Sequence, residues 1–403
     1  MKKNNHAGCI ALFCAALFVG AFVAEAAEKP LPTVYWMSIA TTNQTMPGMP
    51  REIPAGMLGG LGGGPKKTML LQMNSPRQLP PNPAATHDIP VGMSMGATLP
   101  LMIPQQEKPQ RHDYEQAEER VEKERMRILV YWGCNDTVRP GQPKVIDTAS
   151  MSPGEISRAM RTGVITAQVP PAPGRMRIYA EWPNLKNSLQ VPSDSSLVGE
   201  HFVNGNYTPD IRFAIGSTHD FLAPVEFNGL TGGLSDSIVF NWRRIPNSLG
   251  YFSTVMAHTK NKEMIVWSSS ESYMLGWQLM DYVSSPDARR LVRDRIVMKP
   301  DQISCRIPKG IFSNADGAML QFIAYGEDLH FGYPPKPKDP IWGVRVRSKS
   351  TGMIPLGMET DQRSGRGRSD ETQADTPQLK EQPETERPSG PNPLNTIRGL
   401  FGF

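Results

Sequence analysis

Cysteine is scarce in this chain, whose 403 residues include only four. Cys9 and Cys14 lie in the apolar run near the N-terminus, so Cys134 and Cys305 alone remain once that segment is removed. Neither has a second cysteine nearby, which excludes a cysteine-rich zinc site. The two could form one disulfide between folded units, or stay as buried free thiols, because separation in sequence does not fix the distance between their Cα atoms.

The motifs that most often identify an enzyme are also missing. There is no G-x-S-x-G elbow, no S-x-x-K pair and no glycine loop followed by Lys-Ser or Lys-Thr. The histidines beyond the N-terminal segment do not stand at the i, i+4 or H-x-E spacing of a zinc site, so a conventional catalytic metal is not expected. These histidines are His87, His112, His201, His219, His258 and His330.

A strong charge of one sign is absent as well. The chain has 43 Lys and Arg against 39 Asp and Glu, a formal net charge of +4, and both signs are interspersed through its middle. Without a basic stripe to follow a phosphate backbone, nucleic acid is not expected as a partner.

One long apolar run is present, at the N-terminus. Lys2 and Lys3 precede apolar residues 8–23, and A-E-A at 24–26 supplies a small-x-small cleavage site. This pattern predicts a signal peptide over residues 1–26. A membrane anchor is the alternative, but the run is short for spanning a bilayer. We therefore expect an exported protein, in the periplasm or outside the cell, that meets a membrane only through its export signal.

Residues 27–118 are rich in Met, Pro and Gly. Proline removes backbone donors and glycine raises the entropy cost of order, so this range is predicted to be a disordered leader without a core of its own. Only 33–40 and 68–74 look like short strands within it. Thioethers are soft ligands that suit Cu(I), although we favour the interpretation that the methionines are adaptable apolar filler. The methionines considered as metal ligands are Met46, Met49, Met93 and Met95.

The clearest structural pattern covers residues 237–270. Three runs of β-branched and aromatic residues are separated by turn residues, which predicts a β-meander whose strands each bury one face. Two short helices are predicted at 151–163 and 284–295, because each begins with Ser-Pro and an acidic residue follows. Their similarity indicates one unit of strands and a helix used twice, with coincidence as the alternative.

The last part of the chain changes character twice. The sequence W-G-V-R-V-R at 342–347 alternates apolar residues with arginine, which is typical of an edge or half-exposed strand. Residues 351–403 are polar and predicted to be disordered. Their apolar end, 394–403, is interpreted as a docking tail.

Short segments carry two resemblances. I-L-V-Y-W-G-C at 128–134, with Y-G-E-D-L-H-F-G-Y-P-P-K-P and V-R-V-R-S-K-S near the end, is similar to secreted proteobacterial proteins of no assigned function, and it brings no catalytic residues. W-R-R-I-P-N-S-L-G-Y-F-S-T-V at 242–255 resembles the B and C strands of fibronectin type III or immunoglobulin-like sandwiches. The expected fold is mainly β, with two sandwich-like units at 119–222 and 223–350, each containing a short helix.

Glu327, Asp328 and His330 gather titratable groups that could do general acid and base work, although a polar loop between strands is the simpler interpretation. The predicted function is a non-enzymatic binding or structural component of the bacterial envelope or secreted matrix, with an envelope protein or glycan as partner and no cofactor. The alternatives are a periplasmic Cu(I)-handling protein and an envelope glycan or peptide hydrolase. Candidate contact residues, unless they are core, are Trp182, Trp267, Trp277 and Trp342.

Overall fold

The computed structural model describes residues 31–44, 64–104, 126–160, 165–166, 168–174, 177–335 and 339–357, and the fold given below is that of these residues. It is mainly β, as the sequence predicts, and its strands form three sheets. No helix in these ranges combines the length and the apolar character needed to cross a membrane.

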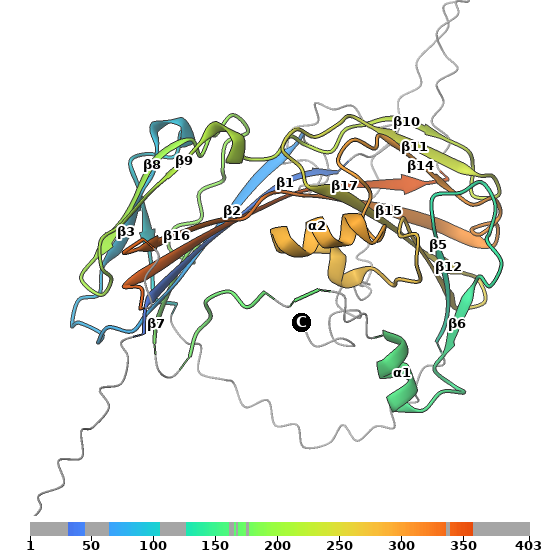
Figure 1. The fold of residues 1–403 in the computed structure, drawn as a ribbon, viewed down its shortest axis with the longest axis horizontal. Coiled ribbons are helices and arrows are strands. Elements are labelled where there is room, and N and C mark those ends of the chain that lie inside the picture. Colours follow the sequence, from blue (N-terminus) through green and yellow to red (C-terminus); the bar gives the residue numbers. More distant parts are fainter. Residues whose placement is uncertain are drawn as a thin grey trace, which may run out of the picture. The chain divides into compact units, whose positions relative to one another are not determined.

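The largest sheet has ten strands in the order β6-β5-β13-β12-β15-β17-β1-β2-β7, and β16 pairs with β17 beside this path (Figure 1). β1 is parallel to β17 and β5 is parallel to β13, while the other neighbours are antiparallel. The strands are β6 (Lys144–Asp147), β5 (Arg127–Trp132), β13 (Glu263–Ser268), β12 (Gly250–Thr259), β15 (Ala315–Tyr325), β17 (Trp342–Leu356), β1 (Thr33–Gln44), β2 (Lys66–Ser75), β7 (Ile178–Trp182) and β16 (Leu329–Tyr333).

Two smaller sheets and five short helical segments complete the described fold. One sheet has the order β4-β3-β8-β9 and the other β10-β11-β14. Their strands are β4 (Thr98–Leu101), β3 (Ala85–Asp88), β8 (Gly199–Gly205), β9 (Ile211–Ile215), β10 (Phe227–Thr231), β11 (Ile238–Trp242) and β14 (Ser304–Ile307). The helical segments are α1 (Pro153–Met160), α2 (Ser285–Arg293) and the 3-10 turns η1 (Val91–Met93), η2 (Ser217–His219) and η3 (Trp277–Met280).

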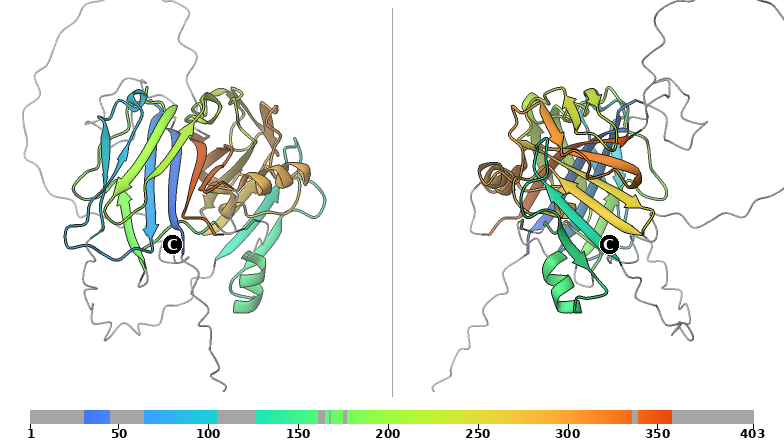
Figure 2. Two further views of the ribbon diagram at one scale, coloured as in Figure 1. Left: turned by 60° about the vertical axis from the view of Figure 1, so that its left-hand side comes forward. Right: turned by 90° about the vertical axis from the view of Figure 1, so that its right-hand side faces the viewer.

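β17 is the strand around which the ten-stranded sheet is arranged. On one side β1 follows it from the Thr33–Trp342 pair to the Gln44–Met353 pair, and Figure 2 shows the blue strands beside the orange-red one. On its other side β16 covers the first part of β17 and β15 covers the second. The short connection between β15 and β16 passes close to β17 at Gly326, whose amide donates a hydrogen bond to the Ser348 carbonyl at 3.0 Å.

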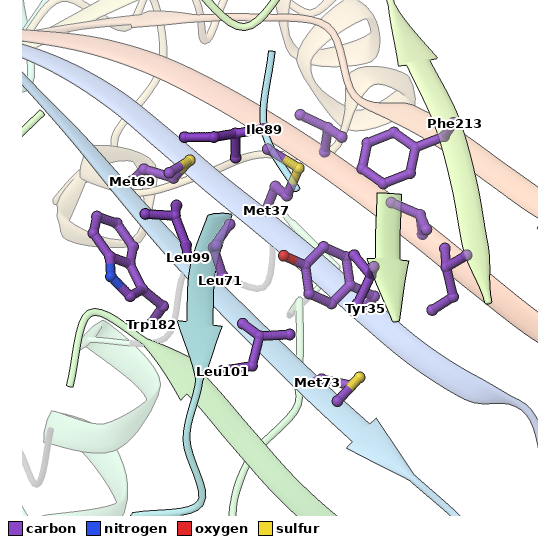
Figure 3. Packing of buried hydrophobic residues seen from close by; sticks show 14 of the residues in the cluster. Tyr35, Met37, Met69, Leu71, Met73, Ile89, Leu99, Leu101, Trp182 and Phe213 are labelled. Atoms are coloured by element: carbon purple, nitrogen blue, oxygen red, sulfur yellow. The ribbon is translucent and has the colours of Figure 1, made fainter. Parts of the chain in front are cut away.

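One face of the ten-stranded sheet carries two apolar clusters. Alternate residues of β1, β2 and β17, among them Tyr35, Leu71 and Val344, pack against the four-stranded sheet (Figure 3). Phe322 of β15 and Ile354 of β17 belong to a second cluster with residues of the three-stranded sheet. Each fully buried side chain of this size contributes about 1.5–3 kcal/mol relative to an exposed one, so these two layers provide most of the core.

The opposite face is covered by helix over only part of its length. Phe252 of β12 and Ile323 of β15 pack with Ala288 and Leu291 of α2. α1 belongs to a different cluster, beside β5 and β6. The two helices therefore sit in different surroundings, which favours coincidence over one unit used twice as the reason for their similar sequences.

Both helix starts agree with the sequence prediction. The Glu155 amide donates to Ser152 Oγ at 3.3 Å, and the Ser152 amide donates back to Glu155 Oε2 at 2.8 Å, which is a capping box. At α2 the Asp287 amide donates to Ser284 Oγ at 3.2 Å. Each bond satisfies a donor that a helix start leaves without a partner.

The described part of residues 27–118 does not match the predicted leader without a core. The two short strands predicted at 33–40 and 68–74 are present as β1 and β2, and they lie in the middle of the largest sheet. β3 and β4, which the sequence analysis did not predict, come from the same range. A strand needs no local core when its partners come from distant segments, and composition does not reveal those partners.

The predicted division into units 119–222 and 223–350 also differs from the sheet. β5, β6 and β7 lie in the first range and β12, β13 and β15 in the second, yet all belong to one sheet. The meander is correct only for β12 and β13, because β11 lies in the three-stranded sheet. The step from β11 to β12 thus crosses between two packed sheets, while the finer immunoglobulin-like arrangement is not confirmed.

The close approach of Gly326 to Ser348 leads to a prediction. A Cβ on Gly326 would lie 1.8 Å from Ser348 Oγ and 3.0 Å from its Cβ, so Gly326→Ala should lower the free energy of unfolding by about 1–3 kcal/mol through overpacking. Gly317→Ala is the matched control, since nothing lies within 4 Å of its added Cβ. Urea denaturation of both variants measures the difference, and equal midpoints would contradict the close approach.

Candidate functional site

Five residues on neighbouring strands form one row across the ten-stranded sheet. Arg345 of β17 pairs in register with His330 of β16 and with Trp36 of β1. Trp36 pairs in turn with Gln72 of β2, and Gln72 pairs with Glu181 of β7. Because side chains alternate between the faces of a strand, this row lies on the face opposite the apolar cluster of β1 and β2.

Two further side chains lie on the same face, two residues along their strands. Arg347 follows Arg345 on β17, and Asn74 follows Gln72 on β2. We call the seven residues the polar face; they are Trp36, Gln72, Asn74, Glu181, His330, Arg345 and Arg347. The strands that carry them are labelled in Figure 1.

Arg347 is an almost fully buried cation, 8% exposed. Its Nε donates to Ser38 Oγ at 2.8 Å and its Nη1 to Gln168 Oε1 at 3.3 Å. Its guanidinium carbon lies 4.2 Å from the Tyr282 ring centroid and 5.0 Å from that of Trp36. Within the described residues no carboxylate lies within 4.0 Å of it. Burial lowers the pKa of this guanidinium, which still remains charged at neutral pH.

The neighbouring cations, by contrast, are each matched by a carboxylate. Arg345 Nη2 lies 2.5 Å from Asp328 Oδ2, whose side chain is 3% exposed. Lys349 Nζ lies 2.7 Å from Asp281 Oδ1. Arg347 therefore has no carboxylate at ion-pair distance among the described residues, and the charges of Asp281 and Asp328 favour its charged form from a greater distance. Glu181 stands three strands from Arg345, about 14 Å by strand spacing, and is too far to pair with it.

Several buried polar atoms here have no hydrogen-bond partner among the residues that the structure describes. They are Gln72 Oε1, Asn74 Oδ1, Gln168 Nε2 and Arg345 Nε. An unsatisfied buried donor or acceptor costs about 1–3 kcal/mol, and such groups are nearly always met by water or a ligand. Two of these atoms are acceptors and two are donors, so together they match a molecule that can both give and receive hydrogen bonds.

An open groove of about 500 Å³ adjoins the polar face at β7. Tyr179 lines it, and the Tyr179 hydroxyl accepts a hydrogen bond from Gln72 Nε2 at 3.2 Å. The same Gln72 nitrogen donates to the Pro171 carbonyl at 3.1 Å, and Pro173 and Gly174 line the groove just beyond it. The groove therefore lies beside the polar face at Tyr179, and Gln72 does not line it.

The three candidate catalytic residues lie at the edge of this site but do not converge. Asp328 is committed to Arg345. Glu327 pairs with Arg289 of α2, and its other oxygen lies 3.6 Å from His219 Nε2. His330 is exposed on the sheet, where partial burial and the Arg345 charge lower its pKa. Among these three residues, no acid and base that are free of ion pairs face a common place where a substrate could bind. The polar-loop interpretation therefore fits them better.

The methionine and tryptophan predictions change once burial is known. Met93 and Met95 are 0% and 7% exposed within the apolar cluster, so their thioethers act there as core filler. Met46 and Met49 lie outside the described residues. Three of the candidate contact tryptophans are core residues rather than contacts: Trp182, Trp267 and Trp342. Trp277 is only half-buried.

Cys134 and Cys305 are joined in the structure, with an S–S distance of 2.14 Å and Cα atoms 5.2 Å apart. Cys305 lies on β14 and Cys134 follows β5, so the bond links the three-stranded sheet to the ten-stranded sheet. It spans 171 residues. A bridge that closes so long a loop restricts the unfolded chain strongly, by about 4 kcal/mol or more in the chain-entropy model.

A second cluster of polar residues is fully buried. The sequence spacing of its histidines did not predict it. The Tyr35 hydroxyl lies 2.8 Å from His87 Nδ1, His87 Nε2 lies 3.0 Å from His201 Nδ1, and His201 Nε2 lies 2.8 Å from the Leu197 carbonyl. With Tyr35 donating to His87, His87 to His201 and His201 to Leu197, every atom is satisfied and both rings are neutral. The pair forms because β3 and β8 are neighbours.

The residues of the polar face escaped sequence analysis, apart from His330. The only signal was the alternation at 342–347, which correctly separates valines from arginines. The edge position inferred from it is wrong, because β17 has partners on both sides. In comparisons with known proteins, no family model, curated protein or solved structure matches this chain.

The buried histidines yield a prediction about pH. Burial lowers the pKa of both rings, and for His87 the neighbouring His201 adds to the effect. The pKa of histidine in the unfolded chain is about 6.5. Below that pH the two rings bind protons in the unfolded chain but stay neutral in the native state. The stability present above that pH should therefore fall as pH drops, by up to about 1.4 kcal/mol per unit for each ring, until the folded pKa is reached.

Urea midpoints measured from neutral pH to about pH 5 test this slope. His87→Gln with His201→Gln should flatten it, whereas His258→Gln, at an exposed position, should leave it unchanged. A slope that is the same in the double variant and the wild-type protein would show that other groups carry the acid sensitivity.

Proposed function

We propose that this chain is an exported, non-enzymatic binding component of the bacterial envelope or secreted matrix, and that the polar face is its binding site. The observation that carries the proposal is a set of buried atoms without a hydrogen-bond partner among the described residues, at Gln72, Asn74 and Arg345 of this face and at Gln168 beside it. Folding alone gains nothing from such atoms, because apolar residues of similar shape would cost less. A bound partner that meets them gives a reason for their presence.

Two features support export. The N-terminal pattern at 1–26 is that of a signal peptide. Cys134 and Cys305 are bonded, and disulfides persist in oxidising compartments outside the cytosol. The periplasm and the extracellular space both meet this requirement.

The arrangement of charges supports binding over catalysis. A general acid or base must be free to exchange a proton with a substrate. Asp328 and Glu327 are instead held by Arg345 and Arg289. What the site offers is a fixed array of donors and acceptors around Arg347, a cation without a carboxylate at ion-pair distance among the described residues, which suits recognition.

Photo-cross-linking in the native host tests this proposal. A photoreactive residue at position 330, exposed on the polar face, should capture an envelope protein or glycan reproducibly. The same residue at position 260, where the lysine side chain is 85% exposed but lies elsewhere in the fold, should not. Mass spectrometry of the captured material identifies the partner.

Arg347→Met in the position-330 protein is the decisive companion variant. It removes the positive charge of Arg347 while keeping an unbranched apolar stem, and capture should be lost. Identical capture at positions 330 and 260, or capture that survives Arg347→Met, would count against the polar face as the binding site.

A further inference from the structure

We propose that three methionines and one histidine on neighbouring strands of the ten-stranded sheet bind a Cu(I) ion. They are Met256 and His258 of β12, Met264 of β13 and Met319 of β15, and we call them the thioether site. β12 and β15 are labelled in Figure 1. No strand carries residues of both the thioether site and the polar face, so this proposal is independent of the function proposed above.

The register of the strands brings the four side chains to one face of the sheet. Met256 pairs with Met319 of β15, and His258 pairs with Met264 of β13. Met256 and His258 are two residues apart on β12, so their side chains lie on the same face. Phe252 of the same strand also lies on this face, where it packs against α2. The thioether site is therefore the continuation of the face that α2 covers.

Strand geometry places the four donor groups within reach of one ion. Directly paired residues on neighbouring antiparallel strands have Cβ atoms about 4.5–5.5 Å apart, and diagonal neighbours are about 7–8 Å apart. Met256 is the central residue, because it lies opposite Met319 and diagonal to Met264. Methionine is unbranched and has three rotatable bonds, so sulfur atoms from these positions can turn toward a common point.

Gly317 leaves room for an ion beside these side chains. It is the partner of His258 on β15, and nothing lies within 4 Å of a Cβ built on it. Met319 is two residues further along the same strand, so this open space adjoins both the imidazole and a thioether. His258 is exposed and the three methionines are half-buried. An ion can therefore reach the site from solvent.

The donor set is typical of a soft metal. Thioether sulfur favours Cu(I), and imidazole is also a copper ligand. Hard cations such as Ca²⁺ and Mg²⁺ need oxygen ligands instead, and the described residues contain no group of three or more His, Cys, Asp and Glu that could hold a metal. Cys134 and Cys305 are bonded to each other, so the thioethers are the remaining soft donors in the described part of the chain.

Packing explains only part of this set of residues. Met256 and Met264 pack against the apolar cluster beside α1, where methionine serves as adaptable apolar filler. His258 and Met319 belong neither to that cluster nor to the other three apolar clusters of the described residues. A filler role therefore accounts for two of the thioethers, but not for the third or for the imidazole beside them.

Anaerobic titration of the oxidised mature chain with Cu(I), in competition with a chromophoric Cu(I) chelator, tests the proposal. Met256→Leu and Met319→Leu should each weaken Cu(I) binding by at least about 10-fold, because even the loss of a residue that only supports a metal ligand costs about that much. Leucine and methionine have similar volumes, so both variants should fold. Zn(II) should bind to the wild-type protein at least about 10-fold more weakly than Cu(I).

Three further variants separate the thioether site from other methionines and from packing. Met280→Leu is the matched control, because Met280 is a half-buried methionine in the cluster beneath α2, and its Cu(I) affinity should equal that of the wild-type protein. Met46→Leu combined with Met49→Leu should also leave the affinity unchanged. His258→Gln should weaken binding and remove the nitrogen neighbour of copper from the X-ray absorption spectrum, which a change in packing alone would not do.

Several outcomes would overturn the thioether site. They are the absence of Cu(I) binding, an affinity that survives both Met256→Leu and Met319→Leu, an affinity lost in the Met46 and Met49 variant instead, and Zn(II) binding as tightly as Cu(I). The X-ray absorption spectrum of the wild-type complex does not depend on the folding of any variant, and copper without sulfur neighbours there would also overturn the site. Cross-linking at position 330 is unaffected by any of these results.

Discussion

The parallel pairing of β1 with β17 is the contact on which the rest of the structure depends. It brings together segments that are 309 residues apart, as the bond from Arg347 Nε to Ser38 Oγ shows. β17 then joins β15 and β16 on one side to β1, β2 and β7 on the other, so without it the largest sheet would fall into two pieces. The entropy of closing so long a loop opposes this contact, and non-local pairing of this kind slows folding.

The same pairing creates the polar face. Alternation along β17 sends Val344 and Val346 into the apolar cluster and Arg345 and Arg347 to the other side. On that side α2 covers β12 and β15, while Tyr282 and the segment near Gln168 and Pro171 contact the part formed by β17, β1 and β2. Trp36 and Arg347 are both buried on that side, at 9% and 8% exposure.

Sequence reasoning succeeded where the relevant interactions are local. Ser152 and Glu155 form the capping box that their spacing predicts, and the alternation at 342–347 separates the two faces of β17 correctly. It failed where the interaction depends on which distant strands become neighbours. Nothing near His87 points to His201, because their contact follows from the pairing of β3 with β8.

The leader prediction failed for a related reason. Proline and glycine between the strands dominate the composition of 27–118, while the strands themselves are stabilised by partners elsewhere in the chain. The polar face shares this property, since Trp36, Gln72 and Arg345 belong to three segments that no local pattern connects. A site assembled by register alone leaves no motif in the sequence.

Stability and binding make opposite demands on the polar face. Arg347 is stabilised by Tyr282, Trp36, Ser38 and Gln168, yet its charge and the neighbouring unsatisfied atoms remain a cost to the folded state. A buried polar network that is only partly satisfied is less favourable than an apolar core. Folded proteins tend to depart from internal consistency at functional sites. The polar face combines both features, and the proposal that it is a binding site rests on these unmet hydrogen bonds rather than on a cavity or a motif.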